Sequence, residues 1–120
     1  MFSLSINNVV TISRGDSFSV PLFLNAGTGV SPIRRILRAG EYVYFAIEQP
    51  NQCFENACLK KRFDKNNLNA NGDVQVDFSA QEMRDLAPGD YYYEIKASFL
   101  DGSGKQIINT VVEKTRFIVL

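Results

Sequence analysis

Alternating apolar and polar residues dominate the C-terminal third of the chain. Between Asp90 and Phe99, the odd-numbered positions are apolar or aromatic and most even-numbered positions are polar, which predicts a half-buried strand. Turn residues precede this segment at Pro88-Gly89 and follow it at 101–104 (Asp-Gly-Ser-Gly). Because another strand-like segment, 106–120, comes next, the sequence predicts a C-terminal β-hairpin.

The same period of two predicts strands in the rest of the chain. Pro21 removes a backbone donor and therefore places its strand at an edge or a bulge. The short strand at 59–63 is heavily basic, as expected of an edge that must not pair with other chains. Ile33 to Arg38 is ambiguous, and we expect a linker with at most one turn of helix. The opening segment from Phe2 to Ile12 is predicted to be an edge strand with a kink or a short hairpin. The other predicted strands are Ser17–Leu24, Glu41–Glu48, Leu59–Phe63 and Val74–Phe78, followed by the two strands of the hairpin.

One helical turn is predicted at 79–86, where Ser79 is the N-cap and Glu82 completes a capping box. About seven short strands without βαβ alternation favour an all-β fold, an immunoglobulin-like antiparallel β-sandwich with one short helical turn, in a single domain spanning 1–120. In such domains a tyrosine at the corner between the sheets often bonds back to upstream backbone, and Tyr91 or Tyr93 is either that residue or a simple core residue. The predicted core is Phe18, Val20, Val43, Phe45, Val74, Val76, Phe78, Tyr93, Ile95 and Phe117.

The amino-acid composition narrows the range of expected binding partners. The chain has 120 residues, and its 13 basic and 13 acidic side chains cancel. A neutral chain lacks the excess positive potential that drives non-specific binding to nucleic acid, so neither nucleic acid nor an anionic membrane is an expected partner. The sequence contains no apolar stretch of transmembrane length and no signal-peptide pattern, so we expect synthesis in the cytoplasm.

No cofactor and no metal are expected. Cys53 and Cys58 are the two cysteines of a chain without histidine, and they cannot supply the usual four-ligand zinc sets. Whether they form a disulfide or stay reduced is left open by the sequence, although cytosolic synthesis favours thiols.

Two short motifs have simpler explanations than binding. Arg14-Gly15-Asp16 spells an integrin-binding tripeptide, but glycine between charged residues is ordinary turn chemistry. The segment Asn67–Phe78 partly matches a calcium-binding loop, yet its first position is Asn and its twelfth is Phe where the loop needs carboxylates. An Asn-Gly turn of type I′ is the preferred interpretation.

Catalytic signatures are also missing from the sequence. Without histidine, the usual catalytic triads and the commonest general base cannot form, and no glycine-rich phosphate loop is present. We therefore expect a protein that is not an enzyme.

The outward tyrosines are the candidate site. In an immunoglobulin-like topology the strand carrying Tyr42 and Tyr44 neighbours the strand carrying Tyr92, which would gather three phenolic rings on one sheet face. These rings either stabilise the sheet by cross-strand pairing or bind a partner, which could be a protein or a stacked sugar.

The order of features along the whole chain resembles one known family. These features are Arg14-Gly-Asp-Ser-Phe18, then Gly40-Glu-Tyr-Val-Tyr-Phe-Ala-Ile47, Gly89-Asp-Tyr-Tyr-Tyr-Glu-Ile95, the Asp101–Gly104 turn and a closing Phe117-Ile-Val-Leu120. They resemble the N-terminal immunoglobulin-like domains of phage upper-baseplate and fibre-attachment proteins.

The resemblance implies a virion structural module of a phage or prophage, made in the host bacterial cytoplasm. Such a module acts in a baseplate, in fibre attachment or in capsid decoration, and its partners are other virion subunits or further copies of itself in a homo-oligomer. Because the sequence ends at Leu120 without the coiled coil or fibre of that family, we expect a stand-alone adaptor or decoration subunit. The rival hypothesis is a carbohydrate-binding or adhesive β-sandwich that uses the tyrosine face.

Overall fold

The computed structural model describes residues 9–26 and 33–120, and these form seven strands and one α-helix. The first part of the predicted opening segment, Phe2–Ile6, lies outside the described residues. Two short 3-10 turns, η1 (Phe54–Asn56) and η2 (Lys65–Asn67), flank β4. The remaining elements are β1 (Val10–Ile12), β2 (Phe18–Leu22), β3 (Tyr42–Glu48), β4 (Leu59–Phe63), β5 (Val74–Phe78), α1 (Ala80–Arg84), β6 (Gly89–Leu100) and β7 (Gln106–Val119).

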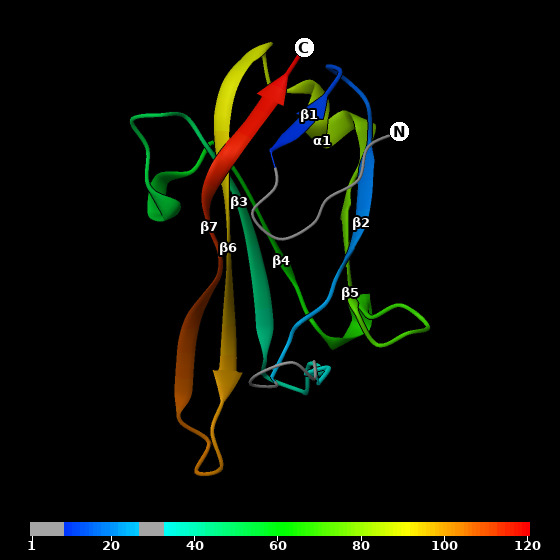
Figure 1. The fold of residues 1–120 in the computed structure, drawn as a ribbon, viewed down its shortest axis with the longest axis vertical. Coiled ribbons are helices and arrows are strands. Elements are labelled where there is room, and N and C mark those ends of the chain that lie inside the picture. Colours follow the sequence, from blue (N-terminus) through cyan, green and yellow to red (C-terminus); the bar gives the residue numbers. More distant parts are fainter. Residues whose placement is uncertain (1–8, 27–32) are drawn as a thin grey trace.

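The strands form two sheets (Figure 1). The larger has five strands in the order β1-β7-β6-β3-β4, and the smaller pairs β2 with β5. The all-β prediction is therefore confirmed, as is the C-terminal hairpin of β6 and β7. The long hairpin projects beyond the ends of β3 and β4 (Figure 1).

The prediction of purely antiparallel sheets is wrong at one edge. β1 runs parallel to β7, with Val10 opposite Phe117 and Ile12 opposite Val119. The turn at Ser13–Asp16 leads from β1 into β2, which belongs to the other sheet, so these consecutive strands do not pair as a hairpin. The absence of βαβ alternation, from which the sequence analysis predicts an antiparallel arrangement, therefore does not determine the direction of a strand that crosses between the sheets.

Aromatic side chains from both sheets meet in the core. Phe45 of β3 stacks on Tyr93 at 5.5 Å between ring centroids and meets Phe18 and Phe78 of the smaller sheet edge-on, at 5.6 and 5.3 Å. All ten predicted core residues are buried. Edge-to-face and offset contacts of this kind stabilise a core beyond the burial of apolar area.

The predicted capping box is confirmed at α1. Ser79 Oγ accepts a hydrogen bond from the Glu82 N–H at 3.1 Å, and Glu82 Oε1 accepts one from the Ser79 N–H at 2.9 Å. Both donors belong to the helix N-terminus, which has no intrahelical partners for them.

The possible helical turn at Ile33–Arg38 does not form. Residues 33–35 lie antiparallel to 24–26 instead, because Ala26 N–H donates to Ile33 and Arg35 N–H donates to Leu24, each at 2.7 Å. These two bonds satisfy backbone groups that a single helical turn would have left to water.

The corner between β5 and β6 shows which of Tyr91 and Tyr93 bonds back to upstream backbone and which is a simple core residue. The Tyr91 hydroxyl donates a 2.7 Å hydrogen bond to the Ala87 carbonyl oxygen. Tyr93 is fully buried and stacks on Phe45. Tyr91 is therefore the corner tyrosine and Tyr93 is a core residue.

Candidate binding face

The three candidate tyrosines project from the outer face of the five-stranded sheet, the side that faces away from β2 and β5. On β3, Val43, Phe45 and Ile47 are buried in the core, so the alternate positions Tyr42 and Tyr44 point outward and are half-buried. On β6 the same alternation turns Tyr92 outward. The three tyrosines thus share one sheet face, as the sequence predicts.

They do not form one continuous cluster. The Tyr42 and Tyr44 rings lie 6.4 Å apart, whereas the β3–β6 register sets Tyr92 opposite Glu48 and Tyr44 opposite Lys96. Tyr92 is therefore displaced from Tyr44 by four residues along the strand, about 13 Å at the rise of a β-strand. Phe54 of η1 is an aromatic neighbour nearer to Tyr44 than Tyr92 is, and its ring meets the Tyr44 ring edge-on with 6.1 Å between the ring centroids.

Phe54 is a residue that sequence analysis missed. Phe54 stands alone in the polar loop between Cys53 and Cys58, so it is not part of an alternating strand pattern. The only sequence signal for a role in the site is an aromatic residue in an otherwise polar segment. In the structure the ammonium groups of Lys60 and Lys96 lie 4.7 and 4.9 Å from the centroid of the Phe54 ring.

Cations accompany the other outward rings as well. The Arg62 guanidinium lies 4.5 Å from the Tyr42 ring centroid, and Lys114 Nζ lies 5.4 Å from that of Tyr92. Cation–π contacts of this kind stabilise exposed sites by about 0.5–1 kcal/mol each. The face around Tyr42, Tyr44 and Phe54 is therefore both aromatic and basic.

A buried carboxylate lies at the other end of this face. Glu48 is fully buried, and its two carboxylate oxygens accept no hydrogen bond from the described residues. Lys114 Nζ is 3.4 Å away and also donates to the Gln52 carbonyl oxygen at 2.9 Å, so it ties the loop after β3 to the sheet. Burial raises the pKa of Glu48, and the neighbouring Glu94 raises it further against the opposing effect of Lys114.

Glu41 shows how the same residue type is accommodated differently. Its buried carboxylate accepts hydrogen bonds from the N–H groups of Arg38 and Leu100, at 2.8 and 2.9 Å, and from the Arg35 guanidinium. Burial alone would raise the pKa of Glu41, but these hydrogen bonds lower it on balance. The Glu41 carboxylate therefore has hydrogen-bond donors that stabilise its charge, whereas the Glu48 carboxylate accepts no hydrogen bond from the described residues.

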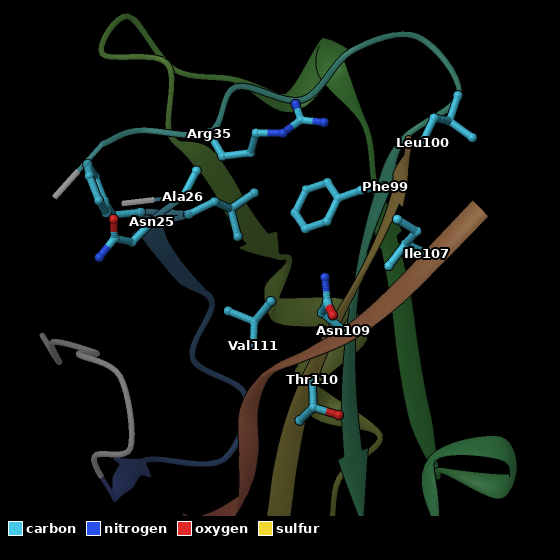
Figure 2. A pocket seen from close by; sticks show the side chains of 11 residues that line it. Asn25, Ala26, Arg35, Phe99, Leu100, Ile107, Asn109, Thr110 and Val111 are labelled. Atoms are coloured by element: carbon cyan, nitrogen blue, oxygen red, sulfur yellow. The ribbon is translucent and has the colours of Figure 1, made fainter. Parts of the chain in front are cut away.

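A groove lies on another part of the molecule, between the lower half of β7 and the segment after β2. Its volume is about 640 Å³, and Figure 2 shows Phe99 and Val111 directed into it across from Arg35 and Ala26. Arg35 also lies 4.9 Å from the Phe99 ring centroid. The lining residues are Phe23, Leu24, Asn25, Ala26, Arg35, Phe99, Leu100, Ile107, Asn109, Thr110 and Val111.

The calcium-like segment Asn67–Phe78 consists of a loop, closed by an antiparallel bridge between Leu68 and Val74, and of β5. The Gly72 N–H donates to the Asn69 carbonyl oxygen at 3.0 Å, so the turn spans 69–72 and Gly72, with φ of 86°, is its fourth residue. The predicted type I′ turn with Asn71-Gly72 at its centre is therefore wrong, and a longer loop with glycine in the left-handed region forms instead. Asn69 Oδ1 accepts bonds from Asn71 and Asp73 N–H, and Phe78 is buried in the core.

The remaining motifs have local roles. Arg14-Gly15-Asp16 is a turn, closed by a 3.1 Å bond from the Asp16 N–H to the Ser13 carbonyl oxygen. Cys53 and Cys58 are both free and exposed, and the Cys58 thiol donates to the Ile47 carbonyl oxygen at 3.1 Å.

The chain matches no protein-family model, no curated protein and no solved structure. Among the described residues, no helix is long and apolar enough to cross a membrane.

Proposed function

We propose that this protein is a non-enzymatic module that binds a protein partner through the outer face of its five-stranded sheet. The observation that carries the proposal is the Tyr42, Tyr44 and Phe54 cluster with Arg62, Lys60 and Lys96 around it. Tyrosine and arginine are the residue types most enriched in the energetically dominant parts of protein interfaces.

We further propose that the domain is immunoglobulin-like. Two features support this arrangement: the strand neighbours β7-β6-β3-β4 in one sheet and β2-β5 in the other, and the hydrogen bond from Tyr91 to Ala87 at the corner before β6. Seven-stranded immunoglobulin-like domains place their second and fifth strands in one sheet, opposite the third, sixth and seventh, and carry a tyrosine at this corner.

The biological setting that we propose is a phage or prophage virion. The domain would serve as a baseplate, fibre-attachment or capsid-decoration adaptor and would contact other virion subunits. Its support is the order of sequence features from Arg14-Gly15-Asp16 to the closing 117–120 segment. Mass spectrometry of purified particles from the encoding strain tests this setting: a reproducible, stoichiometric signal supports it, and absence from intact particles overturns it.

The second candidate is a carbohydrate-binding module that uses the same tyrosines. Half-buried Tyr42 and Tyr44 could stack on a sugar ring. However, Arg62 lies 4.5 Å from the centre of the Tyr42 ring and would have to be displaced before a sugar covered that face. A glycan array distinguishes the candidates, because saturable binding lost in Tyr42→Ser would favour the carbohydrate reading.

A further inference from the structure

Three cations surround the aromatic cluster of the outer face, and none of them is ion-paired with a carboxylate of the described residues. These cations are Lys60, Arg62 and Lys96. The ion pairs found within 9–26 and 33–120 all involve other side chains. Lys60 and Arg62 are exposed and Lys96 is half-buried, in a chain whose charges cancel overall. A local excess of unpaired positive charge favours a partner of opposite charge.

The sheet register determines how these cations are spaced. Tyr44 lies opposite Arg62 of β4 and opposite Lys96 of β6, so one ring separates two cations in a cross-strand row. Lys60 lies two residues before Arg62 on the same strand, opposite Ala46. By the geometry of a sheet, the backbone positions of Lys60 and Arg62 are about 7 Å apart along β4, and those of Arg62 and Lys96 are about 10 Å apart across β3.

Aromatic rings hold the cationic groups in place. The Arg62 guanidinium lies 4.5 Å from the Tyr42 ring centroid, and the ammonium groups of Lys60 and Lys96 lie 4.7 and 4.9 Å from that of Phe54. Lys60 Nζ also donates to the Phe54 carbonyl oxygen at 3.4 Å. A cation that already lies against a ring loses less side-chain freedom when a partner binds, and it retains further N–H donors for an incoming carboxylate.

We propose that the outer face binds an acidic segment of the partner protein, in an extended conformation, with two carboxylates that pair with Lys60 and Arg62 and a third that pairs with Lys96. The inference rests on the proposed function and names the chemistry of its partner. In an extended chain, alternate side chains recur about every 7 Å, which matches the spacing of Lys60 and Arg62 along β4. Arginine also binds a carboxylate through two parallel hydrogen bonds, which favours Arg62 as the strongest of the three contacts.

Single-stranded nucleic acid is the other polyanion that basic and aromatic residues bind, and it fits this face less well. Its bases stack on ring faces, but cations of the protein already lie against the Tyr42 and Phe54 rings. Carboxylates also border the cations, since Glu94 precedes Lys96 by two residues and Glu55 follows Phe54. The positive region is therefore short, which suits a short acidic segment better than a long phosphate backbone.

Titration of the isotope-labelled protein with synthetic peptides, followed by NMR at low ionic strength, tests the proposal. The probes are a peptide of alternating glutamate and threonine residues and its counterpart with glutamine in place of glutamate. We expect saturable changes in the amide signals of β3, β4 and β6 with the acidic peptide and none with the glutamine peptide. Added salt should weaken the binding, because exposed charges are screened.

Removing the three cations should weaken binding of the acidic peptide. We expect K60Q/R62Q/K96Q to lower the affinity about tenfold or more, since each exposed ion pair changes an affinity about twofold to fivefold. Arg62→Lys alone should lower it less than Arg62→Gln does, because lysine keeps the charge and loses the paired hydrogen bonds.

The matched control is K65Q/R84Q/K105Q, which removes two lysines and one arginine at exposed positions outside the outer face. It should keep an affinity close to that of the wild type. Equal binding of the two peptides, or an equal loss in both triple variants, overturns the proposal, as does tighter binding of an oligothymidylate than of the acidic peptide.

This proposal and the proposed function fail separately. Absence of saturable binding by the acidic peptide overturns the acidic partner alone. Peptide binding together with normal incorporation of Y42S/Y44S into particles overturns the proposed function instead.

Discussion

The Tyr91 hydroxyl donates a 2.7 Å hydrogen bond to the carbonyl oxygen of Ala87, four residues earlier in the chain. This bond closes the corner at which the chain leaves α1 and enters β6. Tyr91 is also buried, so its ring and its hydroxyl both fix the direction in which the longest hairpin starts.

Removing this hydroxyl should destabilise the fold modestly. Tyr91→Phe keeps the buried ring and loses the hydrogen bond, so we expect the free energy of unfolding to fall by about 0.5–1.5 kcal/mol. Urea denaturation measures the change. Tyr92→Phe is the matched control, because Tyr92 lies on the outer face, and equal effects of the two changes would contradict the corner role.

Truncating the central core ring should have a far larger effect. Phe45 is fully buried and contacts rings from both sheets, so Phe45→Ala should lower the free energy of unfolding by about 3–5 kcal/mol. That is a large part of the total stability of a small domain. Tyr44→Ala on the outer face is the comparison, and an unchanged denaturation midpoint for Phe45→Ala would show that the ring is not part of the core.

Much of this core could be predicted from the sequence, because strands with one buried face impose a strict period of two on residues such as Phe45 and Tyr93. The helix cap was equally predictable, since Ser79 and Glu82 act through local spacing. Other features depend on which distant segments meet. Phe54 reaches Tyr44 because the loop after β3 folds back over the sheet, and Lys114 of β7 contacts both Glu48 and Gln52 of that loop.

The buried Glu48 should make stability depend on pH. Its pKa is raised in the folded state above the ordinary value of 4.5, so the folded state binds its proton more tightly than the unfolded state does. The contribution of Glu48 to the free energy of unfolding is therefore fully present at pH below 4.5 and is lost as the pH rises through the raised pKa. Glu94 and Lys114 are the charged groups that face Glu48 and set the extent of this loss.

Glu48→Gln should remove this contribution. We expect its melting temperature to exceed that of the wild type by a margin that grows between about pH 5 and about pH 8, reaching about 3 °C or more. Glu113→Gln, which removes an exposed carboxylate, serves as the control. Parallel pH profiles for Glu48→Gln and the wild type would refute the assignment.

The Asn67–Phe78 connection should not require calcium. Asn69 Oδ1 is already engaged by two backbone N–H groups, and the twelfth residue of the segment is a buried phenylalanine instead of a carboxylate. We expect the melting temperature to be the same with calcium and with EDTA. A large decrease on chelation would show that a metal contributes to the fold.

The central claim is that the outer face binds a protein partner, and its most direct test is incorporation of face variants into particles. Two variants would be expressed in place of the wild type in the encoding strain: the double variant Y42S/Y44S and the single variant Tyr92→Ser. Circular dichroism would first confirm that each variant is folded. Quantitative mass spectrometry of purified particles then gives the copies incorporated. We predict about a tenfold or greater loss for Y42S/Y44S, because ring anchors at an interface contribute about 2 kcal/mol or more apiece. Incorporation of Y42S/Y44S at the wild-type level would contradict the account.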